Sequence, residues 1–418
     1  MKKALTIGLT LALAAASLSG CAGQNTQETN PPAATTATAA AESAGETTAA
    51  VTSGQTAEGT GSGDTTTGTI DLSLFEDDDI GVCLVINTNL GDKSICDLSY
   101  AGLKQIEADY GVRVKCIELG GDATKQIPTF IDLAEDPAWD IIITGTPNMR
   151  EALLEVAVDY PEQIFILYDA AAGNESEGTT AADYPNVYSM EHAQNEGSYI
   201  VGAAAAMLTA SGDEKTNEER IIGFVGGGQN TAIEDFLVGY IEGAKAVDPE
   251  IKVLISYIGS FADSAKGKEL AMAQIDQGAD VVFSVAGGAG LGVLAGCAEK
   301  GVYAIGVDGD QYEILKNDDP VTAAAIATSM QKKCDQTVYS CVSRALEGTL
   351  PYGTYDKVGL AGGVVGAADN ENFRSIFSED QIKELKEIEA KVASGEVQVF
   401  SAIGADDSAI QEIKNSVQ

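Results

Sequence analysis

The chain has 418 residues, which is enough for two or three domains of ordinary size. It contains 25 Lys and Arg against 63 Asp and Glu, a net charge of −38 at pH 7, which argues against nucleic acid or an anionic membrane surface as an electrostatic partner. One histidine and seven cysteines also argue against zinc-finger or histidine-based metal chemistry, so we expect neither a metal nor a cofactor. The low aromatic content of 6% and the 46 glycines favour an α/β chain over an all-β chain.

The first 21 residues have the pattern of an export signal. Two lysines precede an apolar run over residues 4–18, which is shorter than the ~20 residues of a spanning helix. Residues 18–21, Leu-Ser-Gly-Cys, resemble the bacterial lipobox, in which the cysteine is acylated and becomes the mature N-terminus. We therefore expect a lipoprotein, anchored to the cell membrane through lipidated (palmitoylated) Cys21 on the extracytoplasmic face. The alternative is that a cysteine falls near the cleavage site by chance.

The segment 22–70 differs sharply in composition from the rest of the chain. It consists mainly of Thr, Ala, Gly, Ser, Gln and Glu and contains no Lys or Arg. Such a segment cannot bury enough apolar area to offset the entropy lost on ordering. We expect a disordered linker here, followed by a substrate-binding domain over 71–418.

The domain repeats a short Val/Ile-rich run, a turn and an amphipathic helix. Two series of strands are predicted, at 80–86, 112–117, 140–144 and 163–168, and then at 221–225, 252–257, 280–285 and 302–307. Helical patterns lie between them at 98–110, 149–159, 232–246, 264–277 and 290–300, and a long helix at 197–208 separates the two series. This alternation predicts βαβ units and two α/β lobes, each a doubly wound parallel sheet.

We assign the first lobe to about 78–192 plus 309–346 and the second to about 193–308 plus 347–418. In this assignment 321–329 and 331–346 return to the first lobe, and a helix at 381–393 closes the second. Ligands of open α/β sheets bind at the carboxyl ends of the strands, so two facing lobes create one central cleft. Crossovers near 191–196 and 308–311 would then act as hinges.

Several motifs in the strand-end loops resemble one known family. They are Gly91–Ser94 (GDKS), Ile221–Gly227 (IIGFVGG), Gly259–Asp263 (GSFAD), Gly278–Val282 (GADVV) and Ile305–Gln311 (IGVDGDQ). Together they resemble the basic membrane protein family of bacterial lipoproteins, which includes purine nucleoside receptors of ABC importers, over about 80–366. The resemblance implies a type I periplasmic-binding-protein fold that closes over a nucleoside, with an ABC permease and an ATPase as partners.

Asp308 and Lys332 are the candidates for the sugar end of the site. Asp308 ends a Val/Ile strand, where an ionised carboxylate can accept two hydrogen bonds from the vicinal hydroxyls of a ribose. Its alternative role is the N-cap of the next helix. Lys332 matches the family lysine at the sugar end, and its alternative is a solvated helix lysine with Lys333 beside it.

Four further residues are candidates for contact with the ligand. Gly287 and Gly288 allow backbone to come close to a ligand, although turn duty would also explain them. Phe236 matches an aromatic that faces the base, with a core phenylalanine as the alternative. Asp92 resembles the group that reads the base edge.

The sequence departs from the family pattern at two places. The usual Phe-Asn after Ser94 appears as Ile95-Cys96, and Gly145-Thr146 lacks the Phe that often follows that glycine. The departures leave open a different polar solute of the same fold, such as a sugar or a signalling molecule. A surface lipoprotein with an adhesive or structural role is a further alternative.

No motif predicts an enzyme. The glycines at 226–228 lack the G-x-G-x-x-G spacing, and His192 has no Ser or Cys elbow beside it. The cysteines at 83, 96, 116, 297, 334 and 341 form no C-x-x-C pair, although Cys83 and Cys116 could be strand neighbours. Buried free thiols are the default for these six residues.

Overall fold

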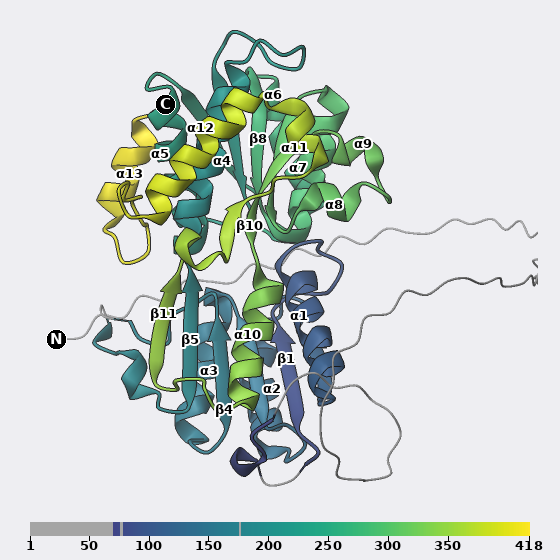
Figure 1. The fold of residues 1–418 in the computed structure, drawn as a ribbon, viewed down its shortest axis with the longest axis vertical. Coiled ribbons are helices and arrows are strands. Elements are labelled where there is room, and N and C mark those ends of the chain that lie inside the picture. Colours follow the sequence, from purple (N-terminus) through teal and green to yellow (C-terminus); the bar gives the residue numbers. More distant parts are fainter. Residues whose placement is uncertain (1–69, 76–77, 175–176) are drawn as a thin grey trace, which may run out of the picture. The chain divides into compact units, whose positions relative to one another are not determined.

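The computed structural model describes residues 70–75, 78–174 and 177–418. The predicted signal peptide over 1–21, lipidated Cys21 and the linker over 22–70 lie outside the described residues, apart from Ile70. The described folded unit contains two six-stranded sheets with helices on both faces of each (Figure 1). Among the described helices, none has the length and apolar character needed to cross a membrane.

The first lobe is built on an all-parallel sheet with the strand order β11-β5-β4-β3-β1-β2. Its strands are β1 (Gly81–Ile86), β2 (Arg113–Glu118), β3 (Ile141–Gly145), β4 (Ile164–Tyr168), β5 (Val187–His192) and β11 (Thr354–Val358). Successive side chains of β1 point to opposite faces, so Val82 and Leu84 pack under one pair of helices and Cys83 and Val85 under another. The first pair is α1 (Ile95–Tyr110) and α10 (Cys334–Leu346), and the second is α2 (Gln126–Glu135) and α3 (Pro147–Asp159).

The second lobe has the order β12-β10-β9-β8-β6-β7, in which β12 alone is antiparallel to its neighbour. Its strands are β6 (Ile221–Gly226), β7 (Lys252–Tyr257), β8 (Ala279–Val285), β9 (Tyr303–Asp308), β10 (Ile326–Lys332) and β12 (Val365–Ala367). One face is covered by α4 (Gln194–Thr209), α5 (Thr231–Val247) and α12 (Glu379–Ala393), and the other by α6 (Ser264–Ile275) and α7 (Gly287–Lys300). Shorter helices complete the lobe: α8 (Gln311–Leu315), α9 (Pro320–Ala323), α11 (Glu371–Ile376) and α13 (Asp407–Asn415).

Within the described residues, the chain passes between the lobes three times. The crossings follow β5 at Ala193, β10 at Lys333 and β11 at Gly359. Backbone hydrogen bonds tie these segments together, since Ala193 N donates to Val358 O at 2.9 Å and Lys333 N donates to Val364 O at 2.9 Å. The three crossings therefore form one hydrogen-bonded connection between the lobes.

The eight strands predicted from Val/Ile-rich runs all form, with each boundary within one residue of its expected place. Four further strands were not predicted: β5, β10, β11 and β12. β5 is buried throughout, but its sequence Val-Tyr-Ser-Met-Glu-His is not an apolar run, so its composition does not predict a central strand. β11 is an edge strand with mostly exposed side chains, and it therefore has no apolar run to recognise.

The predicted lobe boundaries are wrong after residue 308. β10 pairs with β9 in the second sheet, so 309–332 stay in the second lobe, and only α10 and β11 return to the first (Figure 1). The predicted hinge at 191–196 coincides with a crossing, but 308–311 join β9 to α8 inside one lobe and cannot be a hinge. The six described cysteines are all free, and Cys83 lies in register with Lys115 rather than with Cys116.

Helices α4 and α5 approach so closely that glycine is required at their contact. A β-carbon on Gly243 would overlap the carbonyl oxygen of Tyr199, which is backbone and cannot rotate away. We predict that Gly243→Ala lowers the free energy of unfolding by about 1–3 kcal/mol, because the helices must separate to admit the methyl group. Urea denaturation of the purified protein measures this change.

Gly296→Ala on α7 is the matched control. Its new β-carbon would meet neighbouring atoms no closer than 3.4 Å, and alanine favours a helix by roughly 1 kcal/mol over glycine. This variant should therefore be neutral or more stable. Equal midpoints for the two variants would contradict the close-contact explanation.

Candidate functional site

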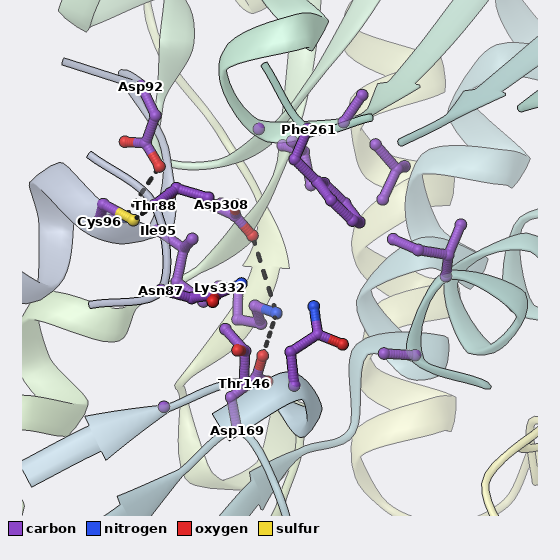
Figure 2. Close-up of a pocket in the computed structure, with 18 of the residues that line it drawn as sticks. Asn87, Thr88, Asp92, Ile95, Cys96, Thr146, Asp169, Phe261, Asp308 and Lys332 are labelled. Atoms are coloured by element: carbon purple, nitrogen blue, oxygen red, sulfur yellow. Dashed lines mark hydrogen bonds and ion pairs between the residues drawn. The ribbon is translucent and has the colours of Figure 1, made fainter. Parts of the chain in front are cut away.

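A cleft lies where the carboxyl ends of the strands of both sheets meet (Figure 2). It encloses about 900 Å³ of empty space, part of it open to solvent. The first lobe contributes residues at and after the ends of β1, β3 and β4. The second lobe contributes residues at and after the end of β8, the last residues of β9 and β10, and Phe236 and Phe261. All six site residues predicted from sequence line this cleft: Asp92, Phe236, Gly287, Gly288, Asp308 and Lys332.

Asp308 is the last residue of β9 and its carboxylate is buried in the cleft. Its Oδ2 accepts a hydrogen bond from the Ser94 hydroxyl of the first lobe, and its Oδ1 lies 3.9 Å from Lys332 Nζ (Figure 2). Burial raises the pKa of Asp308, although the Lys332 ammonium and the Ser94 hydroxyl oppose this effect. Asp308 does not cap the next helix, because Asp310 does so. The carboxylate therefore faces the cleft with acceptor capacity left over.

Lys332 ends β10 and is 4% exposed, so it is not a solvated helix lysine. Its Nζ donates to Asp169 Oδ2 at 2.8 Å, across the two lobes, and lies 3.5 Å from Gln194 Oε1. Burial alone would lower the pKa of Lys332, but Asp169 and Asp308 raise that pKa above its usual range. Burial alone would raise the pKa of Asp169, but Lys332 and His192 lower the pKa of that carboxyl to about 2. Both groups are thus charged at neutral pH.

Asp92 lines the cleft, but its carboxylate accepts hydrogen bonds from the first turn of α1, the helix that follows it. Its Oδ1 accepts hydrogen bonds from the backbone N–H groups of Ser94 and Asp97, and its Oδ2 from that of Cys96. These bonds satisfy donors at the start of α1, which have no partner within the helix. Burial raises the pKa of Asp92, and the three N–H groups partly oppose the rise. The geometry explains Asp92 as a cap, and its predicted contact with a base stays a prediction.

The apolar side of the cleft contains two aromatic rings. Phe236 is 2% exposed, packs against Phe283 with ring centroids 6.4 Å apart, and lies 5.1 Å from Lys332 Nζ. Phe236 is therefore a core residue that also lines one side of the cleft. Phe261, on the loop between β7 and α6, is only partly buried and projects into the cleft (Figure 2). We did not predict Phe261 from sequence, although it lies inside the GSFAD motif.

Gly227 makes room for the Phe261 ring, because a β-carbon at this position after β6 would overlap the ring. A β-carbon on Gly288 would lie 3.4 Å from the Phe261 carbonyl oxygen, which is an ordinary contact. Gly287 has φ +52°, a conformation that most other residues avoid. The sequence signal for Phe261 was the set of glycines that follow the neighbouring strands β6 and β8.

The cleft also holds the residues with strained backbones. Of the five described non-glycine residues with positive φ, three line the cleft: Thr146 at +77°, Asp169 at +59° and Asp308 at +64°. Such conformations persist where the surrounding structure enforces them, and they cluster at functional sites. The buried Thr146 Oγ1 has no hydrogen-bond partner within the described part of the chain. This hydroxyl therefore has its hydrogen-bonding capacity unused in the structure.

Charge in the cleft is predominantly negative. Among the described lining residues, the acids are Asp92, Asp169 and Asp308, and the cation is Lys332. Among all the residues that the structure describes, no group of three His, Cys, Asp or Glu side chains is arranged to hold a metal ion. The arrangement can accept hydrogen bonds from a polar group and pack an apolar ring.

Comparison with known proteins gives a consistent result. A model of the family described as ABC transporter substrate-binding protein PnrA-like matches residues 80–402. The ABC transporter nucleoside-binding protein BmpA of Lactococcus lactis subsp. cremoris is 31% identical over 307 residues, which cover 70% of this chain and 82% of the relative. Basic membrane protein D of Borreliella burgdorferi is 28% identical over 334 residues, which cover 79% of this chain and 91% of the relative.

A solved structure with the same architecture is that of an ABC transporter solute-binding protein from Aeropyrum pernix K1. It matches with a TM-score of 0.71 and 24% identity over 81% of this chain and 98% of that chain, which supports the type I periplasmic-binding-protein fold. The family model spans most of the folded part, and the motifs that predicted the resemblance lie inside it. This chain therefore belongs to the PnrA-like family of ABC transporter substrate-binding proteins.

Proposed function

We propose that this protein is the lipid-anchored extracytoplasmic receptor of an ABC importer and that it binds an unphosphorylated nucleoside, for delivery to a permease driven by an ATPase. The observation that supports it best is a cleft with a buried, ligand-accessible carboxylate, Asp308, and a partly buried ring, Phe261. A nucleoside has the matching chemistry, with hydroxyls on its sugar and a flat apolar face on its base. A relative named as a nucleoside-binding protein supports the same assignment.

The sugar end of the proposed site is the charged cluster at the ends of β9 and β10. Asp308 Oδ1 lies beyond hydrogen-bonding distance of Lys332, at 3.9 Å, so it can accept a bond from a ribose hydroxyl. The Lys332 ammonium lowers the pKa of Asp308 against the effect of burial, and it can donate to a sugar oxygen. Because both side chains are buried, hydrogen bonds made to them are stronger than bonds made in water.

The base end of the proposed site is formed by Phe261 and the glycine backbone beside it. Stacking of a base on an aromatic ring contributes about 1–3 kcal/mol and is tolerant of base identity. The free hydroxyl of Thr146 supplies a polar contact with the ligand. Phe236 belongs to the core cluster against which Phe261 packs.

Contacts between the lobes support closure over the ligand. Ser94 to Asp308, Lys332 to Asp169, and Gln311 Nε2 to the Lys93 carbonyl at 3.2 Å all join one lobe to the other. A ligand seated between them would contact both lobes and favour the closed arrangement.

A second candidate is a different polar solute, such as a sugar, and one observation favours it. Ile95 and Cys96 line the cleft where the family resemblance implies a ring and an amide. The Cys96 sulfur lies 3.3 Å from the Thr88 hydroxyl, so this wall offers few free groups to a base edge. A ligand without a base would lose less binding free energy at this wall, because it needs no partners for a base edge.

Membrane attachment depends, in this proposal, on Cys21. We expect Cys21→Ala to leave the chain without a lipid and to shift it from the membrane fraction to the soluble fraction, because acyl chains on Cys21 are the proposed source of its membrane affinity. Metabolic labelling with a fatty-acid analogue and fractionation measure both effects. Retention of the variant in the membrane fraction at the wild-type level would contradict the anchor.

Asp308→Asn tests the sugar contact with little change of shape. We expect nucleoside affinity to fall about tenfold or more, because a charge-assisted hydrogen bond of about 1.5–3 kcal/mol is weakened. Calorimetry measures the affinity, and thermal unfolding checks the fold. Unchanged affinity would remove Asp308 from the ligand contacts.

The same variant serves as the control for pH dependence. As pH falls through the raised pKa of Asp308, the carboxylate gains a proton and loses acceptor capacity, so wild-type affinity should weaken above the usual aspartate value of 3.8. Because the pKa of the buried carboxyl is raised, protonation of Asp308 favours the folded state, and the loss is not unfolding through this group. The acidic decline should be smaller in Asp308→Asn.

Charge in the cleft predicts discrimination against phosphate. A nucleoside monophosphate brings ~1.5–2 negative charges to a cleft whose described lining has three carboxylates and one lysine, itself paired with Asp169. We expect a nucleoside to bind at least about tenfold more tightly than its 5′-monophosphate. Titration with adenosine and AMP, and with guanosine and GMP, measures the ratio. A preference for the phosphate would contradict this account of the cleft.

A further inference from the structure

The chain has one histidine, His192, and it is fully buried at the junction of the lobes. It is the last residue of β5, immediately before the first crossing. Its Nδ1 lies 3.0 Å from Asp169 Oδ1, and its Nε2 lies 2.9 Å from Thr337 Oγ1 on α10. His192 itself does not line the cleft, but its partner Asp169 does.

We infer that His192 is a positioning residue, which orients Asp169 so that Lys332 is held away from Asp308 and Asp308 stays free for the ligand. The inference rests on the proposed function only for the statement that Asp308 receives the ligand's hydroxyls.

The hydrogen-bond partners assign the tautomer of His192. Asp169 is ionised at neutral pH and can only accept, so His192 Nδ1 carries the hydrogen. In a neutral imidazole Nε2 then accepts, and the Thr337 hydroxyl is its donor. Every polar atom of the ring is satisfied, and the ring cannot rotate without losing both bonds.

Asp169 has two oxygens and each holds a different partner. Oδ1 accepts from His192, and Oδ2 accepts from Lys332 at 2.8 Å. The His192 bond therefore fixes the plane of the carboxylate and with it the point where Lys332 Nζ rests. Asp169 also has φ +59°, an unfavourable backbone conformation that such side-chain bonds help to hold.

Lys332 stands between two carboxylates, and its position determines whether Asp308 can bind a ligand. In the structure Nζ is in contact with Asp169 but 3.9 Å from Asp308 (Figure 2). If Asp169 were free to turn away, the buried ammonium would gain by moving into contact with Asp308, because a buried cation needs a paired anion. A direct ion pair would then occupy Asp308 Oδ1.

The network also joins the hinge segments. Lys332 immediately precedes the second crossing, and Val358, in register with His192, immediately precedes the third. Asp169, His192 and Thr337 belong to the first lobe and Lys332 to the second. His192 thus connects the position of a ligand-site cation to the place where the lobes are joined.

Two variants of His192 and one of Thr337 test the inference. His192→Phe fills the site without hydrogen bonds, whereas His192→Asn keeps a donor near the position of Nδ1. Thr337→Val removes the partner of Nε2 and leaves Asp169 untouched. Crystal structures of the ligand-free variants report the position of Lys332, and calorimetry with adenosine and with 2′,3′-dideoxyadenosine reports binding.

We expect Lys332 Nζ to move into direct contact with Asp308 in His192→Phe, and adenosine affinity to fall about tenfold. His192→Asn should restore most of this affinity, and Thr337→Val should show a smaller loss. The dideoxy analogue lacks the hydroxyls that Asp308 accepts, so its affinity should change little. This contrast separates positioning from general damage to the fold.

The inference is overturned if Lys332 keeps its place in His192→Phe, or if the two nucleosides lose affinity equally. If His192→Phe does not fold, the other two variants still test the inference. Lys332 Nζ should keep its position in His192→Asn and should shift toward Asp308 in Thr337→Val. Failure of wild-type protein to bind adenosine would count against the proposed ligand, while the ligand-free structures would still decide the role of His192.

Discussion

The buried ion pair between Asp169 and Lys332 is the interaction on which the organisation of the cleft depends. Removing two charges from water costs several kcal/mol per ion, and a contact at 2.8 Å offsets this cost only with further hydrogen bonds. His192 and Gln194 lie in position to supply them. Such a pair adds little net stability, so its consequence is geometric: it sets where a cation stands relative to Asp308.

That geometry is supported by rigid elements rather than by flexible loops. Asp169 follows β4, and Asp308 and Lys332 are the last residues of β9 and β10, so parallel sheets deliver all three side chains to one place. The positive φ of Thr146, Asp169 and Asp308 costs about 1–3 kcal/mol per residue. Strands buried on both faces in the two cores provide the stability that offsets this strain.

The cleft is also the place where the two lobes meet, so binding and closure share the same residues. Asp308 accepts a hydrogen bond from Ser94 of the first lobe, and Lys332 pairs with Asp169 of the first lobe. The three crossings lie beside these contacts and are tied by backbone hydrogen bonds. A ligand that contacts Asp308 therefore acts on the same groups that hold the lobes together.

The sequence by itself determined the class of fold, the eight Val/Ile-rich strands, the family and six residues of the cleft, including Asp308 and Lys332. These follow from local signals, because parallel strands buried on both faces read as apolar runs and ligands bind at strand ends. Only the tertiary structure decided the rest. From the sequence we assigned the segment of β10 to the first lobe, but its pairing with β9 places it in the second sheet. Asp169 and Lys332 meet across 163 residues of chain, and Ser94 and Asp308 across 214. No local pattern encodes which distant side chains will share one buried site, so the charge network, the role of His192 and the exposure of Phe261 emerged only from the packing of the two lobes.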